Sequence, residues 1–165
     1  MRSMEISLFI NGRRVRDVID ADTVLLDFLR DHGCPSVKRG CDTANCGLCT
    51  VWVEEKPVLS CSYPAARAEG LHVTTLEGLR REAEEFGAIL AGFGAEQCGF
   101  CSPGFIMSVL AMERELSCPT DEEIKEYLAG NLCRCTGYVS QLRAVKEYLN
   151  RKRPETAEKR EEGRP

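Results

Sequence analysis

Eight of the ten cysteines in this 165-residue chain fall into two groups of four, and this grouping constrains the fold more than any other feature of the sequence. Hydrophobic residues make up 43% and charged residues 29% of the chain, an ordinary composition that builds a core without disulfides. We expect no membrane span, because no apolar run approaches the roughly 18 residues that one needs. The first residues lack the apolar core of a signal peptide. We therefore expect a cytoplasmic protein whose cysteines bind metal or carry out redox chemistry.

The charge balance narrows the class of partner. The formal net charge is -4 at pH 7, whereas a nucleic-acid-binding domain needs a clustered excess of lysine and arginine to neutralise phosphates. We therefore expect a protein partner or a small cofactor, and no nucleic acid.

The first half of the chain shows the two-residue alternation of β-strands. Residues 5–10 and 13–18 flank Asn11-Gly12, a pair that favours a two-residue hairpin turn. A second hairpin is expected around residues 54–57, and a last strand over residues 72–75. Between the hairpins, Asp22 or Thr23 is expected to cap a short helix. These elements predict a small mixed sheet with one helix and one long loop that contains cysteines.

The second half changes to helical periodicity. Four helices are predicted. The first is indicated by an apolar stripe of Phe86, Ile89, Leu90 and Phe93, and the second by an N-cap at Ser102 followed by Pro103. The third begins at a capping box of Thr120 and Glu123, and the fourth is indicated by apolar spacing over residues 139–150. We expect one domain over residues 1–78, a second over residues 79–150, and a polar, mobile tail over residues 151–165.

The first quartet has the spacing Cys41-x4-Cys46-x2-Cys49-x11-Cys61, which is typical of the 2Fe-2S site of plant-type ferredoxins. Gly40 and Gly47 stand where the backbone must turn tightly and direct N–H groups at sulfur. Zinc is the minority alternative, because its structural sites usually combine two separated Cys-x2-Cys pairs. A redox pair of Cys46 and Cys49 would leave the other two cysteines unexplained.

The second quartet has the spacing Cys98-x2-Cys101-x31-Cys133-x-Cys135. Each pair precedes a predicted helix, and the partial positive charge of two helix N-termini favours an anionic thiolate site. Arg134 adds a full positive charge between two of the cysteines. Spacing alone leaves a four-cysteine zinc site open here.

Both quartets lie in three motifs: Gly40-Cys41-x4-Cys46-Gly47-x-Cys49-Thr50-Val51, Gln97-Cys98-Gly99-Phe100-Cys101-Ser102-Pro103-Gly104 and Asn131-Leu132-Cys133-Arg134-Cys135-Thr136-Gly137-Tyr138. With these motifs the chain resembles the iron-sulfur subunits of the molybdenum hydroxylases, the family of xanthine dehydrogenase, aldehyde oxidoreductase and carbon monoxide dehydrogenase. The resemblance covers roughly residues 4 to 150. It implies an α+β chain: an N-terminal β-grasp, plant-type ferredoxin-like domain followed by an all-α four-helix bundle domain, with one 2Fe-2S cluster in each.

The resemblance also implies a function. The chain would pass electrons one at a time from a molybdopterin centre in a large subunit to FAD in a medium subunit, while the complex hydroxylates its substrate with oxygen from water. A purine is favoured as substrate, with aldehydes and aromatic compounds as alternatives. The helical-domain cluster is expected to lie nearer molybdenum, where Gln97 and Cys135 contact the pterin. The residues expected to surround the clusters are Gly40, Gly47, Gly99 and Arg134.

Three residues do not follow this pattern. Ala44 stands where the family commonly has glycine, and alanine costs about 1 kcal/mol or more if the backbone there is left-handed. Cys34 and Cys118 belong to neither quartet, and we expect them to be small structural thiols.

Two other functions remain open from the sequence. A free-standing two-cluster ferredoxin would be a stable monomer without partner subunits. A zinc-stabilised interaction module would contain neither iron nor sulfide, and would have no redox role.

Overall fold

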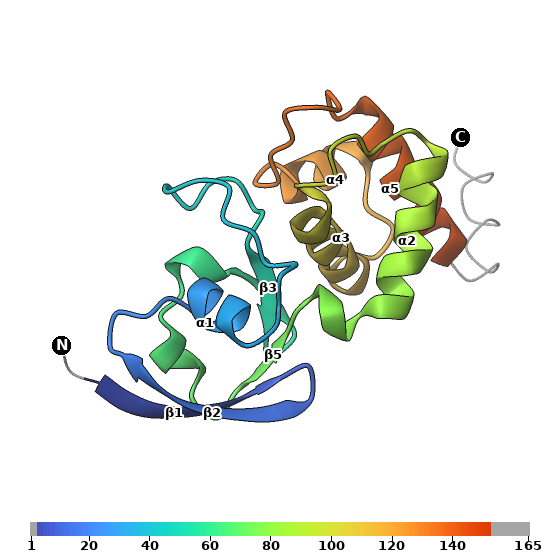
Figure 1. Ribbon diagram of the computed structural model, residues 1–165. Coiled ribbons are helices and arrows are strands. Elements are labelled where there is room, and N and C mark those ends of the chain that lie inside the picture. Colours follow the sequence, from blue (N-terminus) through green and yellow to red (C-terminus); the bar gives the residue numbers. More distant parts are fainter. Residues whose placement is uncertain (1–2, 153–165) are drawn as a thin grey trace, which may run out of the picture.

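A computed structural model of the chain describes residues 3–152. The strands and one helix lie in one part of the molecule, and the four remaining helices lie in the other (Figure 1). This division confirms the predicted order of a mixed sheet followed by a helical bundle. Of the predicted tail, Arg151 and Lys152 belong to the last helix, and residues 153–165 lie outside the described residues.

Five strands form one mixed sheet in the order β2-β1-β5-β3-β4. Their bounds are β1 (Ser3–Ile10), β2 (Arg13–Asp20), β3 (Thr50–Val53), β4 (Lys56–Leu59) and β5 (His72–Thr74). β1 pairs antiparallel with β2 and parallel with β5, and β3 pairs antiparallel with β4 and β5.

Both predicted hairpins are confirmed. Their turns have the positive φ angles that a two-residue turn of type I′ requires, at Asn11 (50°), Gly12 (80°), Glu54 (49°) and Glu55 (65°). The second turn is shorter than the predicted residues 54–57, because Lys56 and Pro57 already pair with β3.

The helix α1 (Leu25–Asp31) packs on the sheet with four buried side chains, those of Leu25, Leu26, Phe28 and Leu29. The prediction that Asp22 or Thr23 caps this helix is wrong, because the N-cap is Val24 and no side chain caps it. Val24 instead forms an isolated β-bridge with Pro64, and the Leu25 N–H donates to the Tyr63 carbonyl at 2.7 Å. A distant backbone segment therefore satisfies one of the N–H groups at the helix start that have no partner inside the helix.

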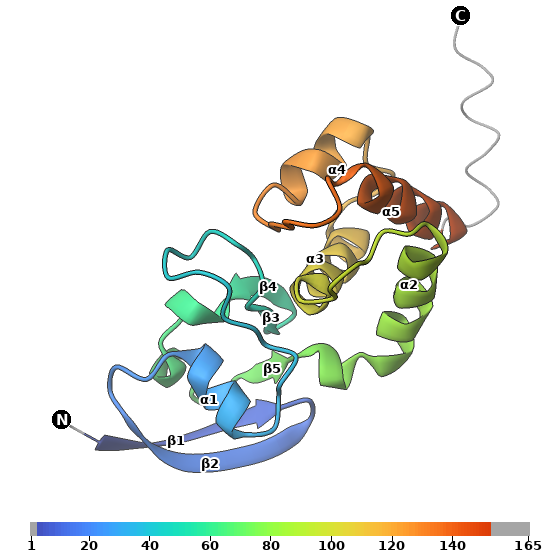
Figure 2. The same cartoon turned by 45° about the horizontal axis from the view of Figure 1, so that its top comes forward.

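The helical part contains α2 (Arg80–Gly92), α3 (Ser102–Glu115), α4 (Asp121–Tyr127) and α5 (Val139–Lys152). The central helix is α3 (Figure 2), and its residues from Gly104 to Met112 are all buried. The predicted capping box is confirmed at α4, where Thr120 accepts from the Glu123 N–H and the Glu123 carboxylate accepts from the Thr120 N–H.

Two local predictions about these helices are wrong. Ser102 is not the N-cap of α3, since Cys101 occupies that position and the Ser102 hydroxyl donates to Glu96 at 2.6 Å. Phe93 does not continue the apolar stripe of α2, because the helix ends at Gly92. Its side chain is 41% exposed.

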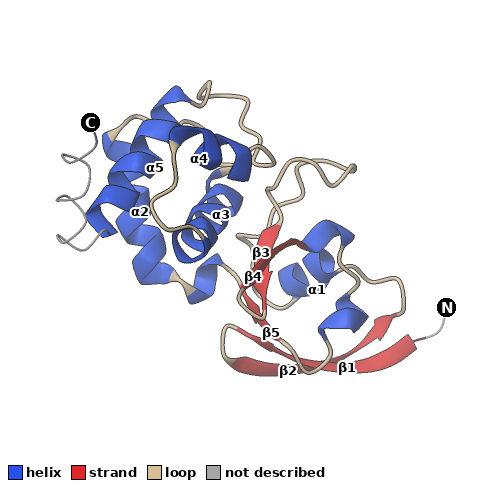
Figure 3. Cartoon of the chain, turned by 180° about the vertical axis from the view of Figure 1, so that it is seen from behind, coloured by secondary structure: helices blue, strands red, loops and turns tan. Residues whose placement is uncertain are grey.

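The two parts meet where β3 lies against α3 (Figure 3). Trp52 of β3 is buried in the hydrophobic core of the helical part, and its indole N–H donates to the Met107 carbonyl at 3.1 Å. The chain crosses between the parts through a short 3-10 helix, η3 (Leu76–Gly78). Within residues 3–152, no helix has the length and apolar character needed to cross a membrane.

Candidate metal centres

The first quartet lies on the loop between α1 and β3 and on a short 3-10 helix, η1 (Ser60–Ser62). Cys46 and Cys49 are buried, and Cys41 and Cys61 are half-buried. The thiols meet in two pairs, Cys41 with Cys46 and Cys49 with Cys61. The fold therefore brings the four predicted residues of this quartet together.

The second quartet lies at the N-terminal side of α3 and α5, as predicted. The sulfur atoms of Cys98 and Cys135 are 3.6 Å apart, and the half-buried thiols of Cys101 and Cys133 are in contact. Cys98 and Cys135 are exposed, so this quartet reaches the surface of the chain.

Pairs of thiols are the arrangement that a 2Fe-2S cluster needs, since each of its two irons takes two protein ligands. A structural zinc ion instead needs four ligands around one point. In the described part of the chain, no group of three or more histidine, cysteine or carboxylate side chains has the geometry to hold a single metal ion. The paired thiols and their sulfur chemistry fit a two-iron cluster in each quartet.

Hydrogen bonds distinguish the thiols within the first quartet. Backbone N–H groups, first that of Asn45 and then that of Thr43, lower the pKa of Cys41 to about 6. Burial raises the pKa of Cys61 to about 12. The loop thus directs several N–H donors at Cys41, the arrangement that stabilises anionic sulfur.

A side chain stabilises one sulfur of the second quartet. Burial acts to raise the pKa of Cys133, but hydrogen bonds outweigh it, the first from the Thr136 side chain, and the pKa falls to about 7. The Thr136 hydroxyl donates to the Cys133 sulfur at 3.3 Å. Thr136 was not identified as a functional residue from the sequence, although a hydroxyl three residues after a cysteine is a usable signal.

Two of the predicted glycines sit in close contact with their surroundings. A Cβ at Gly40 would lie 3.2 Å from the Cys46 sulfur and would also crowd Leu48. Gly47 has φ 71° and lies against the backbone of Gly130 and Asn131, so that a Cβ has no room there.

The other two predicted surrounding residues are less constrained. Gly99 has φ 73°, and a Cβ there would approach Glu96 at 3.3 Å. Arg134 is exposed beside the second quartet. The backbone at Gly99 therefore favours glycine by its conformation more than by lack of space.

Gln97 is exposed directly beside Cys98. Several large apolar side chains are also exposed in the motifs of the second quartet, namely those of Phe100 (49%), Leu132 (47%), Tyr138 (46%) and Val139 (61%). Isolated exposed apolar residues are normal, but a group of them around one site is typical of an interaction surface.

A cavity of about 440 Å³ joins the two quartets. Cysteines of both quartets line it, together with Leu48 and Leu132. At this place the Leu132 N–H donates to the Cys46 carbonyl at 2.9 Å. Leu132 directly precedes Cys133, so one hydrogen bond and one residue separate a cysteine of the first quartet from a cysteine of the second.

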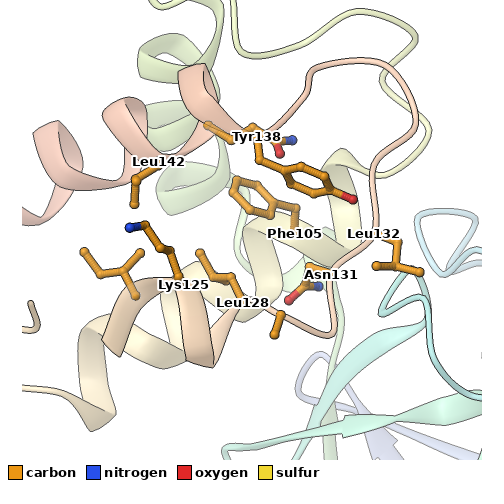
Figure 4. A pocket seen from close by; sticks show the side chains of 10 residues that line it. Phe105, Lys125, Leu128, Asn131, Leu132, Tyr138 and Leu142 are labelled. Atoms are coloured by element: carbon orange, nitrogen blue, oxygen red, sulfur yellow. The ribbon is translucent and has the colours of Figure 1, made fainter. Parts of the chain in front are cut away.

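A second cavity, of about 270 Å³, opens between α4 and the start of α5. Phe105, Leu128, Leu142 and Tyr138 form much of its apolar wall, and Lys125 lies at it as well (Figure 4). The side-chain oxygen of Gln141, which also lines it, is buried without a hydrogen-bond partner among the described residues.

Comparison with known families gives two matches, which together cover most of the chain. Residues 8–91 match the 2Fe-2S iron-sulfur cluster binding domain, and residues 75–146 match the [2Fe-2S] binding domain. One domain of each kind therefore follows the other, in the order that the fold shows.

Relatives that match over most of their own length are small subunits of oxidoreductases. The nicotinate dehydrogenase small FeS subunit of Eubacterium barkeri is 39% identical over 92% of this chain and 98% of its own length. The xanthine dehydrogenase iron-sulfur-binding subunit of Escherichia coli O157:H7 is 43% identical over 82% of this chain and 88% of its own length.

A solved structure agrees with these relatives. A chain of quinoline 2-oxidoreductase from Pseudomonas putida 86 superposes with a TM-score of 0.81 at 33% identity, over 92% of this chain and 99% of that chain. Sequence, fold and paired thiols lead to the same family. The chain belongs to the iron-sulfur, electron-transfer subunits of the molybdenum hydroxylases.

Proposed function

We propose that this chain conducts electrons one at a time from a molybdopterin centre in a large partner subunit to FAD in a medium partner subunit. The ligands of the first cluster are Cys41, Cys46, Cys49 and Cys61, and those of the second are Cys98, Cys101, Cys133 and Cys135. When bound, each 2Fe-2S cluster accepts and releases one electron. We place the boundary between the two cluster-binding domains at residues 78 and 79, where η3 ends.

The hydrogen bond from the Leu132 N–H to the Cys46 carbonyl carries this proposal. It gives the chain a short, fixed connection between its two sets of ligands. Leu48 and Leu132 contribute apolar side chains to the lining of the space between the quartets. A rigid connection of this kind suits transfer between two fixed centres.

The exposed side of the second quartet is the side that we propose faces the molybdopterin subunit. Cys98 and Cys135 reach the surface, and Gln97 stands beside them. The amide of Gln97 has both a donor and an acceptor for the edge of a pterin, and Cys135 contacts the same group. The exposed apolar side chains of Phe100, Leu132, Tyr138 and Val139 then become buried against that subunit.

The first quartet then lies toward the FAD-binding subunit. Its loop is partly open, since Cys41, Ala44 and Asn45 are half-buried or exposed. Four residues shape the surroundings of the clusters. The three glycines allow the backbone conformation there, and the arginine adds a positive charge: Gly40, Gly47, Gly99 and Arg134.

We propose that the whole complex works in the cytoplasm. Its substrate is a purine, an aldehyde or an aromatic compound, with a purine favoured, since the names of relatives and similar structures include xanthine, quinoline and aldehyde.

Metal analysis of the full-length chain tests the ligand assignment. We expect about four iron and four acid-labile sulfide per chain, and two EPR signals after reduction. Cys101→Ala should remove one signal and keep the other, whereas the control Cys118→Ala, an exposed cysteine outside both quartets, should keep both. Zinc without sulfide would contradict the redox function.

Co-purification tests the partner assignment. The native chain should elute in a complex with a molybdopterin-containing subunit and an FAD-containing subunit. A full-length chain that carries both clusters and elutes only as a monomer would indicate a free-standing ferredoxin instead.

A further inference from the structure

Three hydrogen bonds form a closed ring on the loop that ends at the start of α5. The Thr136 hydroxyl donates to the Cys133 sulfur at 3.3 Å, and the Tyr138 N–H donates to the Thr136 hydroxyl oxygen at 3.3 Å. The Cys133 N–H donates to the Tyr138 hydroxyl at 3.0 Å. The ring begins and ends at Cys133, which we have proposed as an iron ligand.

The ring fixes the direction of the threonine proton. A hydroxyl has one proton and two lone pairs. The Tyr138 N–H donates to one lone pair of the Thr136 oxygen, and a cysteine thiolate that binds iron has no proton to donate, so the Thr136 proton is the one that joins the two groups. The hydrogen bond to Cys133 therefore has a defined polarity.

The backbone is held in an unfavourable conformation to make this ring. Tyr138 has φ 70° and follows Gly137 with φ 67°, and a left-handed conformation is unusual for a tyrosine. Unusual backbone angles of this kind gather at functional sites. Figure 4 shows the Tyr138 side chain on the wall of the cavity that Phe105 also lines, with its hydroxyl directed toward the loop that carries Leu132.

Backbone N–H groups serve sulfurs of both quartets, and Cys133 accepts from those of Thr136 and Cys135. Backbone N–H groups of Thr43, Asn45 and Cys46 serve the Cys41 sulfur. Among residues 3–152, Thr136 is the one side chain other than cysteine that donates a hydrogen bond to a thiol of either quartet. The two sites thus differ in one group that a single substitution removes.

From this ring we infer that Thr136 raises the reduction potential of the second cluster through its hydrogen bond to Cys133, and that Tyr138 is the positioning residue for that donor. The inference rests on the proposed ligand assignment. Reduction adds negative charge that spreads onto the cysteine sulfurs, so a donor at sulfur stabilises the reduced state more than the oxidised state. Cys133, the sulfur that Thr136 affects, also directly follows Leu132, whose N–H donates to the Cys46 carbonyl of the first quartet.

An EPR-monitored redox titration of the full-length chain in its native complex tests the inference. In Thr136→Val the ratio of reduced to oxidised second cluster at a fixed potential should fall about tenfold, which is 59 mV for one electron. Thr136→Ser, which retains the hydroxyl, should stay within about twofold of the wild type. The first cluster should keep its potential in both variants.

A double-substitution experiment tests the role of Tyr138. Tyr138→Phe removes the acceptor for the Cys133 N–H and should lower the potential of the second cluster when Thr136 is present. It should cause no further shift in the Thr136→Val background. The matched control is Tyr127→Phe, whose hydroxyl donates to Glu115 outside the ring and which should leave both potentials unchanged.

Specific results would overturn the inference. An unchanged second potential in Thr136→Val, or an equal shift of both clusters, would contradict the role of Thr136. Equal effects of Tyr138→Phe with and without Thr136 would show that the tyrosine does not act through the threonine. If Thr136→Val fails to retain its cluster, an unchanged potential in Tyr138→Phe contradicts the inference instead. Absence of the second EPR signal from the wild type would contradict the ligand assignment itself.

Discussion

At the scale of single residues, Ala44 carries a measurable conformational penalty. Its φ is 54°, which confirms that this position of the first cysteine loop is left-handed. An L-residue with a Cβ loses about 1–2 kcal/mol in this conformation. The chain retains alanine here, although glycine would relieve the strain.

Ala44→Gly should therefore stabilise the protein. We expect a gain of about 1 kcal/mol in the free energy of unfolding, measured by reversible denaturation of the cluster-loaded chain. The control is Ala83→Gly inside α2, where glycine should cost about 1 kcal/mol. Changes of the same sign in both variants would contradict the assignment of strain to position 44.

Glu77 is a second residue whose surroundings allow a prediction, here about the dependence of stability on pH. Its carboxylate accepts from the Ser36 N–H at 2.8 Å, the Ser36 hydroxyl at 2.7 Å and the Thr75 hydroxyl at 2.6 Å. Burial acts to raise the pKa of Glu77, but these hydrogen bonds outweigh it and lower the pKa. Glu77 thereby ties the segment after α1 to η3, where the chain crosses between its two parts.

The lowered pKa of Glu77 determines how the stability of the protein changes with pH. The stabilisation is fully present above the pKa of Glu77 in the unfolded chain, and is lost as the pH falls through its lower pKa in the folded chain. Glu77→Gln should therefore be less stable than the wild type at neutral pH, with a smaller difference at acid pH. Denaturant titrations from pH 7 downward measure this, and a difference that grows toward acid pH would contradict it.

At the scale of elements, the first turn of α3 determines how closely the two parts approach. Gly104 lies against the carbonyl of Gly47, and a Cβ added there would come within 2.8 Å of the Leu48 Cα. Both neighbours are backbone of the first cysteine loop, so the crowding cannot be relieved by a change of side-chain rotamer. This contact couples the packing of α3 to the conformation of the loop.

Gly104→Ala should consequently destabilise the chain by about 1–3 kcal/mol, the usual cost of overpacking. Gly87→Ala makes the same change in α2, where nothing lies within 4 Å of the added Cβ, and it should stabilise by about 1 kcal/mol. Thermal unfolding of the two variants compares them directly. A neutral Gly104→Ala would show that α3 moves freely relative to the loop.

The elements also show which features the sequence could predict. Both hairpins and the capping box at Thr120 depend on residues close together in the chain, and the cysteines of the two quartets stand in short motifs, so all were predictable from local patterns. The start of α1 was not, because its first N–H bonds to Tyr63 far along the chain. The contacts of Trp52 with α3 and of Leu132 with Cys46 were not predictable either, since they depend on how the two parts pack.

At the scale of the whole molecule, the two quartets differ in their protection from solvent. Cys46 and Cys49 of the first are 7% and 2% exposed, whereas Cys98 and Cys135 of the second are exposed. The second site is shielded only when a partner covers that face.

The isolated chain should therefore lose its second cluster first. When the purified subunit is treated with a chelator in air, we expect the second EPR signal to decay before the first, because its sulfur ligands are open to solvent. The same treatment of the complete complex is the control, and there the difference in decay should be much smaller. Earlier loss of the first signal from the isolated chain would contradict this expectation.

The pairing of the thiols also has a consequence for biosynthesis. The first quartet joins cysteines that are near neighbours in the chain, and its last member is Cys61. In the second site the sulfur contact between Cys98 and Cys135 spans 37 positions, and no part of it is complete until the ribosome has passed Cys133. A prematurely terminated product that ends between the two helices α3 and α5 therefore contains all four cysteines of the first quartet and only two of the second.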